Sequence, residues 1–161
     1  MNFLYRFLYE IQEFSKLCSQ AVINLFRKPR YLQDSLLQMD IIGTGSIVII
    51  VITGFFMGGV LALQSAKSLR DFGAVNLTGQ LVTLALVREL GPVLTALMVA
   101  GRVGSGIASE LGSMVVTEQI NAMRALGTDP IKKLVTPRMI ASTTMLPLLT
   151  IVADFCGLVG G

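Results

Sequence analysis

Residues 3–26 repeat apolar side chains at spacings of three and four, with polar residues between them. This period predicts an amphipathic helix. The stretch has no long run free of charge, and most of the aromatic residues in the chain lie before Tyr31. Both features favour a helix that lies on a membrane surface rather than crossing it. Packing of the apolar stripe on a protein core is the alternative interpretation.

Three longer apolar runs follow, at residues 41–63, at 77–101 with an extension to about 116, and at 139–161. About 20 predominantly apolar residues are needed to cross a bilayer as a helix. The pattern therefore predicts an all-α integral membrane protein with three transmembrane helices. Together with the surface helix and a short cytoplasmic helix at 117–127, these form a single domain over residues 1–161.

The basic residues set the predicted orientation. Five lie before the first span and five after the second, whereas the connection at 64–76 carries only two. These are Arg6, Lys16, Arg27, Lys28 and Arg30, then Arg102, Arg124, Lys132, Lys133 and Arg138, against Lys67 and Arg70. The excess of positive charge on cytoplasmic loops places the N-terminus and residues 102–138 in the cytoplasm, with the last span ending outside.

The composition of the chain argues against several classes of function. The chain has 161 residues, of which 53% are hydrophobic and 14% charged, which is too apolar for an ordinary soluble domain. The net charge of +3 is small, so no nucleic-acid partner is expected. Histidine is absent, and the two cysteines are far apart, so we expect no metal site and no catalytic residues. No G-x-x-x-x-G-K-[ST] motif occurs, so we expect no nucleotide cofactor on this chain and no enzymatic activity of its own.

Arg88 and Glu89 lie inside the second apolar run, four and three residues before Pro92. Adjacent helical residues point about 100° apart, so the two side chains should seek other partners. Pro92 cannot donate to the carbonyl of Arg88, which predicts a kink. Charges inside a membrane usually serve function, and a structural ion-pair network is the alternative.

Small residues mark two close-contact faces. Gly54 and Gly58 form a G-x-x-x-G pair in the first span. In the second, a small-residue face combines a row at every fourth position with a neighbouring row: Ala96, Ala100, Gly104, Ala108 and Gly112, beside Gly101, Ser105, Ser109 and Ser113. Such a face fits an interface between subunits and equally fits packing within one chain.

The segment TEQINAMRALGTDP predicts the short cytoplasmic helix. Thr117 is expected to cap its N-terminus, Gly127 to end it, and Asp129-Pro130 to stop it. Ile120, Met123 and Leu126 form an apolar stripe that fits a cleft in a soluble partner. A helix lying on the bilayer is the alternative.

The last residues, Gly157 to Gly161, provide no polar flank for the third span, which indicates a fragment of a longer protein. Beyond these patterns, the chain resembles the MlaE (YrbE) family, the permease subunits of Mla-type ABC transporters that move phospholipids in diderm bacteria. RELGPVLTAL, AGRVGSGIASELGSM, TEQINAMRALGTDP and the following PR carry the resemblance, with LPLLT and the D-x-x-G-x-x-G beginning at Asp154.

The resemblance implies two permease copies around a lipid cavity in the bacterial inner membrane, docked on a cytoplasmic ABC ATPase that binds ATP, with a periplasmic MCE-domain protein outside. It implies that residues of the short helix couple to the ATPase, namely Glu118, Gln119, Ile120, Met123, Arg124 and Leu126. It implies a lipid cavity formed by Leu61, Leu69, Phe72, Arg88 and Glu89.

We therefore expect a phospholipid permease subunit, with Gly54, Gly58, Gly104, Ala108 and Gly112 in helix packing. One alternative is a membrane scaffold that anchors a soluble complex without transport. Another is an ion-coupled carrier that uses Arg88, Glu89 and Asp154.

Overall fold

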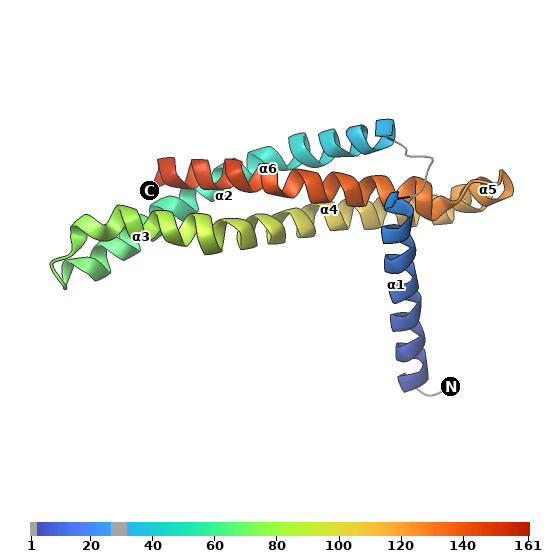
Figure 1. The fold of residues 1–161 in the computed structure, drawn as a ribbon, viewed down its shortest axis with the longest axis horizontal. Helices are drawn as coiled ribbons and strands as arrows, with labels where there is room; N and C mark the ends of the chain where they lie inside the picture. The colour runs from blue at the N-terminus through green and yellow to red at the C-terminus, as the bar shows by residue number, and fades with distance from the viewer. Residues whose placement is uncertain (1–2, 27–31) are drawn as a thin grey trace. The chain divides into compact units, whose positions relative to one another are not determined.

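The computed structural model describes residues 3–26 and 32–161, and these form helices joined by short connections, without strands (Figure 1). The elements run in this order: α1 Phe3–Phe26, α2 Leu32–Arg70, the 3₁₀ turn η1 Val75–Leu77, α3 Thr78–Ala85, the π turn η2 Leu86–Leu90, α4 Gly91–Val116, α5 Gln119–Ala125, the π turn η3 Ile131–Val135, and α6 Thr136–Gly160.

Three continuous helical stretches are long and apolar enough to cross a membrane: Leu32–Arg70, Val75–Val116 and Ile131–Gly160. The predicted all-α membrane fold is confirmed. The stretches are longer than the apolar runs that revealed them. At 1.5 Å per residue the 39 residues of α2 reach about 58 Å, nearly twice the roughly 30 Å hydrocarbon core.

The chain divides into two compact units, residues 1–39 with 110–142 (unit 1) and residues 40–109 with 143–161 (unit 2). In unit 2, α6 lies directly beside α2 at a row of small residues (Figure 1). A Cβ atom added to Gly58 would lie 1.8 Å from the carbonyl oxygen of Gly157, and one added to Gly54 would lie 2.8 Å from that of Ala153. The two backbones are in contact, and they can approach this closely only because glycine has no side chain.

Unit 1 contains α1, α5 and η3. The helix α1 contacts η3, and Ala21 is buried, with 2% of its surface exposed. Most of the described apolar side chains of α1 are exposed: Tyr5, Phe7, Leu8, Tyr9, Ile11, Phe14, Leu17 and Ile23. This uncovered apolar surface is what a helix on a membrane surface requires.

The helix α5 ends as predicted and begins differently. Gly127 has φ +73°, its N–H donates to the carbonyl of Arg124, and the N–H of Thr128 donates to that of Met123, which is a Schellman motif. The prediction that Thr117 caps α5 is wrong: its hydroxyl donates to the carbonyl of Ser113 at the end of α4. Instead Glu118, at φ 57°, turns the chain from α4 into α5.

Both π turns lie immediately before a proline. The N–H of Gly91 donates to the carbonyl of Leu86 just before Pro92, and the N–H of Thr136 donates to that of Ile131 just before Pro137. A proline in a regular α-helix clashes with the carbonyl four residues earlier. The wider turn relieves that clash, so each helix continues through its proline.

The contact between α2 and α6 gives a stability prediction. Replacing Gly58 with Ala forces the two backbones apart and should lower the free energy of unfolding by about 1–3 kcal/mol. Gly79→Ala on α3 is the control, because a Cβ there meets nothing within 4 Å. Thermal unfolding in detergent compares the two variants. Equal melting temperatures would show that α2 and α6 do not depend on this contact.

Candidate functional site

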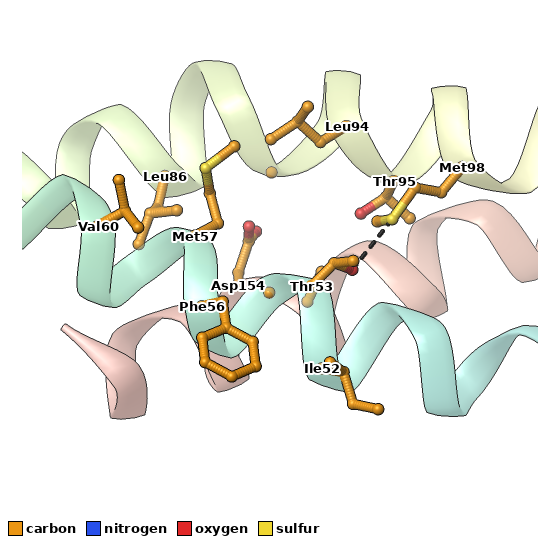
Figure 2. Close-up of a pocket in the computed structure, with 13 residues that line it drawn as sticks. Ile52, Thr53, Phe56, Met57, Val60, Leu86, Leu94, Thr95, Met98 and Asp154 are labelled. Atoms are coloured by element: carbon orange, nitrogen blue, oxygen red, sulfur yellow. Dashed lines mark hydrogen bonds between the residues drawn. The ribbon is translucent and has the colours of Figure 1, made fainter.

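Unit 2 contains a partly open apolar cavity of about 420 Å³ between α2, α6 and the stretch from η2 into α4 (Figure 2). Ligand sites are typically cavities of roughly 300–1,000 Å³ with mostly apolar walls and a few polar groups. Its lining residues are Ile52, Thr53, Gly54, Phe56, Met57, Val60, Leu86, Gly91, Leu94, Thr95, Met98, Ala153 and Asp154. The cavity is therefore the first candidate for a binding site in this unit.

Three polar side chains line the cavity, and they differ in their bonding. The hydroxyl of Thr53 donates to the carbonyl of Ile49 and lies 3.0 Å from the sulfur of Met98 (Figure 2). Thr95 is fully buried and Asp154 is partly buried; Oγ1 of Thr95 and Oδ1 of Asp154 are shielded from solvent and have no hydrogen-bond partner among the described residues. A buried polar atom without a partner is costly, so both atoms point to a missing hydrogen-bond partner.

Glycine lets the carboxyl group of Asp154 approach α4. A Cβ added to Gly91 would lie 1.7 Å from Oδ1 of Asp154 and 2.8 Å from the carbonyl oxygen of Leu86. Gly91 closes the π turn η2, and Thr95 follows one helical turn later. The turn, the glycine and the threonine thus bring one face of α4 against the acid of α6.

The structure places the residues predicted for the lipid cavity elsewhere in unit 2. Leu61 and Leu69 are half-buried on α2, Phe72 is exposed, and Arg88 and Glu89 are exposed on η2. None of the five lines the cavity described above. Within the described residues, neither Arg88 nor Glu89 forms a salt bridge, so the structure gives no sign of an ion-pair network at this place.

The residues predicted to couple to an ATPase lie on α5 and its ends. Ile120 and Met123 are half-buried within unit 1, and Leu126 is 83% exposed. Gln119 and Arg124 are exposed, and exposed Glu118 accepts a hydrogen bond from the side-chain amide of Asn121. Of the predicted apolar stripe, Leu126 is the side chain most available to a partner.

The glycines predicted for helix packing fall into two groups. Gly54 and Gly58 contact α6 directly. Gly104, Ala108 and Gly112 on α4 are exposed, and a Cβ added to Gly104 or Gly112 would meet nothing within 4 Å. All of the other members of the small-residue face are exposed too: Ala96, Ala100, Gly101, Ser105, Ser109 and Ser113. The described residues therefore leave this face open to a contact outside the chain.

Sequence reasoning missed Gly91 and Thr95, and it named Asp154 only for an alternative function. A signal was available. Gly91 and Thr95 lie four residues apart, on one face of a helix, directly after the helix-disturbing pair of charges. Asp154 is the one acid in the third apolar run. What the sequence does not show is that these residues of two distant spans meet.

Comparison with known proteins identifies the group to which this chain is related. The model of the family described as Permease MlaE matches residues 35–161, which includes all of unit 2. The chain belongs to the MlaE permease family.

Individual relatives of this MlaE permease domain come from bacteria and a plant. A probable ABC transporter permease protein of Rickettsia felis is 45% identical over 97% of this chain and 60% of its own length. The intermembrane phospholipid transport system permease protein MlaE of Haemophilus influenzae is 44% identical over 77% of the chain and 48% of its own length. The chloroplastic protein TRIGALACTOSYLDIACYLGLYCEROL 1 of Arabidopsis thaliana is 37% identical over 88% of the chain and 41% of its own length. The chain spans about 60% of the rickettsial relative.

The unpartnered carboxyl group gives a prediction that this MlaE domain can test. Asp154→Asn keeps the shape of the side chain and removes the buried charge, so it should raise the free energy of unfolding by about 1–3 kcal/mol. Asp40→Asn, at an exposed position on α2, should change little. Denaturation of the purified protein in detergent measures both. A loss of stability in Asp154→Asn would show that a donor outside the described residues holds this carboxylate.

Proposed function

We propose that this chain is part of the permease subunit of an ABC transporter that moves phospholipids between membranes, with ATP hydrolysed on a separate subunit. The observation that carries the proposal is the family match over residues 35–161, combined with an exposed short helix between the second and third spans. The printed names of the Rickettsia and Haemophilus relatives support the transporter class, and the Haemophilus name supports the phospholipid substrate.

The docking point for the ATPase in this proposal is α5. Its Schellman end and the turn at Glu118 fix its position between two spans. Leu126 and Val116 are 83% and 84% exposed at the two ends of this segment, and exposed polar side chains lie between them. A short helix with apolar ends fits a groove on a soluble protein. The proposal places this side of the protein in the cytoplasm of a bacterial inner-membrane protein, together with the N-terminus.

The lipid path in this proposal runs along the surface that carries Leu61, Leu69, Phe72, Arg88 and Glu89, between two copies of the chain. The open small-residue face of α4 is the proposed contact between the copies, and an MCE-domain protein is the proposed periplasmic partner. The apolar cavity beside Asp154 supplies a place for an acyl chain within one subunit.

The ion-coupled carrier is less well supported. That alternative needs Arg88, Glu89 and Asp154 in one site, whereas Arg88 and Glu89 are exposed and only Asp154 lines the cavity. The scaffold alternative explains α5 and leaves the apolar cavity without a role. Affinity purification of the protein from native membranes in mild detergent, with mass spectrometry of proteins and lipids, separates the three. Recovery of an ABC ATPase and enriched phospholipid supports the permease; recovery of neither contradicts it.

The coupling role predicts the effect of a charge on α5. Leu126→Asp places a carboxylate in a desolvated groove and should weaken ATPase binding about thirtyfold, or ~2 kcal/mol, while the protein stays in the membrane. Phe72→Asp is the matched control, since Phe72 is equally exposed, at 84%, on the connection across the membrane. Co-purification of the ATPase measures both. Retention with Leu126→Asp would exclude α5 as the docking helix.

The small-residue face predicts how copies associate. Gly104→Leu meets nothing within the described chain, so the subunit should fold normally but self-associate about tenfold more weakly, or ~1.4 kcal/mol. Leu97→Ala, an exposed change on the same helix, is the control. Size-exclusion chromatography with light scattering in detergent measures the assembly. Unchanged assembly of Gly104→Leu would mean that this face contacts lipid.

A further inference from the structure

A second pocket lies in unit 1 and shares no lining residue with the cavity beside Asp154. It has a volume of about 190 Å³ and combines charged and apolar side chains: Asp34, Leu37, Gln38, Glu110, Lys133, Leu134, Pro137 and Arg138. At about 30 Å³ per water, this is room for roughly six water molecules, or for a polar group of several heavy atoms. Nothing in the proposed transport path uses these residues.

Arg138 is the unusual member of this pocket. It is 5% exposed, and one of its terminal nitrogens lies 2.6 Å from a carboxylate oxygen of Glu110. The other terminal nitrogen, Nη1, is buried and has no hydrogen-bond partner among the described residues. A buried guanidinium with an open donor is costly, and its planar fork suits the oxygens of a phosphate. The ion pair with Glu110 holds the guanidinium in place in the wall of the pocket.

The charges around the pocket are balanced. Lys133 and Arg138 carry positive charge, whereas Asp34 and Glu110 carry negative charge. An anion alone would meet two carboxylates, and a cation alone would meet two basic groups. A ligand that carries one charge of each sign a few bonds apart matches such a lining. Leu37, Leu134 and Pro137 add an apolar wall beside the charges.

The position of these residues along the chain places the pocket at the membrane surface. All three residues lie within the long helical stretches but outside their most apolar parts. Asp34 precedes the apolar run 41–63, Glu110 follows the run 77–101, and Arg138 immediately precedes the run 139–161. Two crossings bring the chain back to the side on which it started, so all three residues lie on that side. Charged residues at the ends of membrane spans lie at the level of the lipid headgroups.

We propose that this pocket binds the headgroup of a zwitterionic phospholipid that carries a primary amine, of the phosphoethanolamine type. Nη1 of Arg138 donates to the phosphate, Asp34 accepts from the ammonium group, and the apolar wall contacts the start of the acyl chains. The site is a structural lipid site of unit 1. It depends on the membrane location of the chain and not on transport or on an ATPase.

Native mass spectrometry of the purified protein in detergent tests the proposal, with phosphatidylethanolamine, phosphatidylcholine or phosphatidylglycerol added. We expect retention of phosphatidylethanolamine about tenfold above the other two, which corresponds to ~1.4 kcal/mol. Equal retention of all three would overturn the proposal and mean that water fills the pocket. Preferred retention of phosphatidylglycerol would overturn it in favour of a simple anion site. Displacement of the lipid by inorganic phosphate would assign the pocket to a soluble anion instead.

Substitutions in the pocket test whether the lipid preference arises there. Asp34→Asn removes the partner of the ammonium group without touching the ion pair, and should remove the preference over phosphatidylcholine. Arg138→Lys keeps the charge and removes the second donor, and should weaken retention of all phosphate headgroups. Asp40→Asn, outside the pocket on α2, should behave as the wild type. Circular dichroism confirms folding of each variant; a folded Asp34→Asn with unchanged preference would overturn the proposal.

Discussion

The contact between the backbones of α2 and α6 is the constraint on which unit 2 depends. In a membrane, apolar side chains gain little by meeting each other, because lipid is as apolar as they are. Close approach of two backbones replaces that missing force with dispersion and with contacts of carbonyl oxygens. Gly54, Gly58 and Gly157 permit this close approach. Gly160 continues the contact, since a Cβ added to Gly160 would lie 2.1 Å from the carbonyl oxygen of Phe55.

That contact also determines where the cavity lies. Gly54 and Ala153 belong both to the contact and to the cavity wall, so the space opens where the paired helices meet α4. Asp154 follows Ala153 directly and is turned from α2 towards Gly91. A side chain at Gly54 or Gly58 would push α6 outward and move the carboxyl group of Asp154 away from Gly91. Packing and chemistry therefore use the same few small residues.

Unit 1 follows a different rule. Its residues lie at the ends of the spans, where charges, water and headgroups are available, and its central contact is the ion pair of Arg138 with Glu110. This pair joins α4 to α6 on either side of α5, so the short helix is held between two fixed ends. Ionic contacts suit this region because the cost of desolvation is lower at the membrane surface than in its core.

The sequence predicts where the helices lie along the chain, but not which helices pack against each other. Runs of apolar residues located all three spans, and Gly127 located the end of α5, because these features depend on residues close together in the chain. Gly54 and Gly58 were recognisable as a contact face, but nothing local names α6 as the partner. Asp154 was visible as an isolated acid. Its place beside Gly91 depends on the tertiary structure of the 62 residues that lie between them. Thr117 does not cap α5 because its hydroxyl instead donates to a carbonyl of the preceding helix.

The two π turns have a consequence for how this chain tolerates changes in length. A π turn contains one residue more than an α turn, and one residue corresponds to about 100° of rotation. Loss of one residue within Leu86–Leu90 would turn the π turn into an α turn, restore the clash at Pro92 and rotate everything before it relative to α4. Leu86 would then leave the cavity wall, and the charged pair would face a new direction. In the two helical stretches that contain a π turn, deletion of one residue would therefore rotate one half of the stretch relative to the other half.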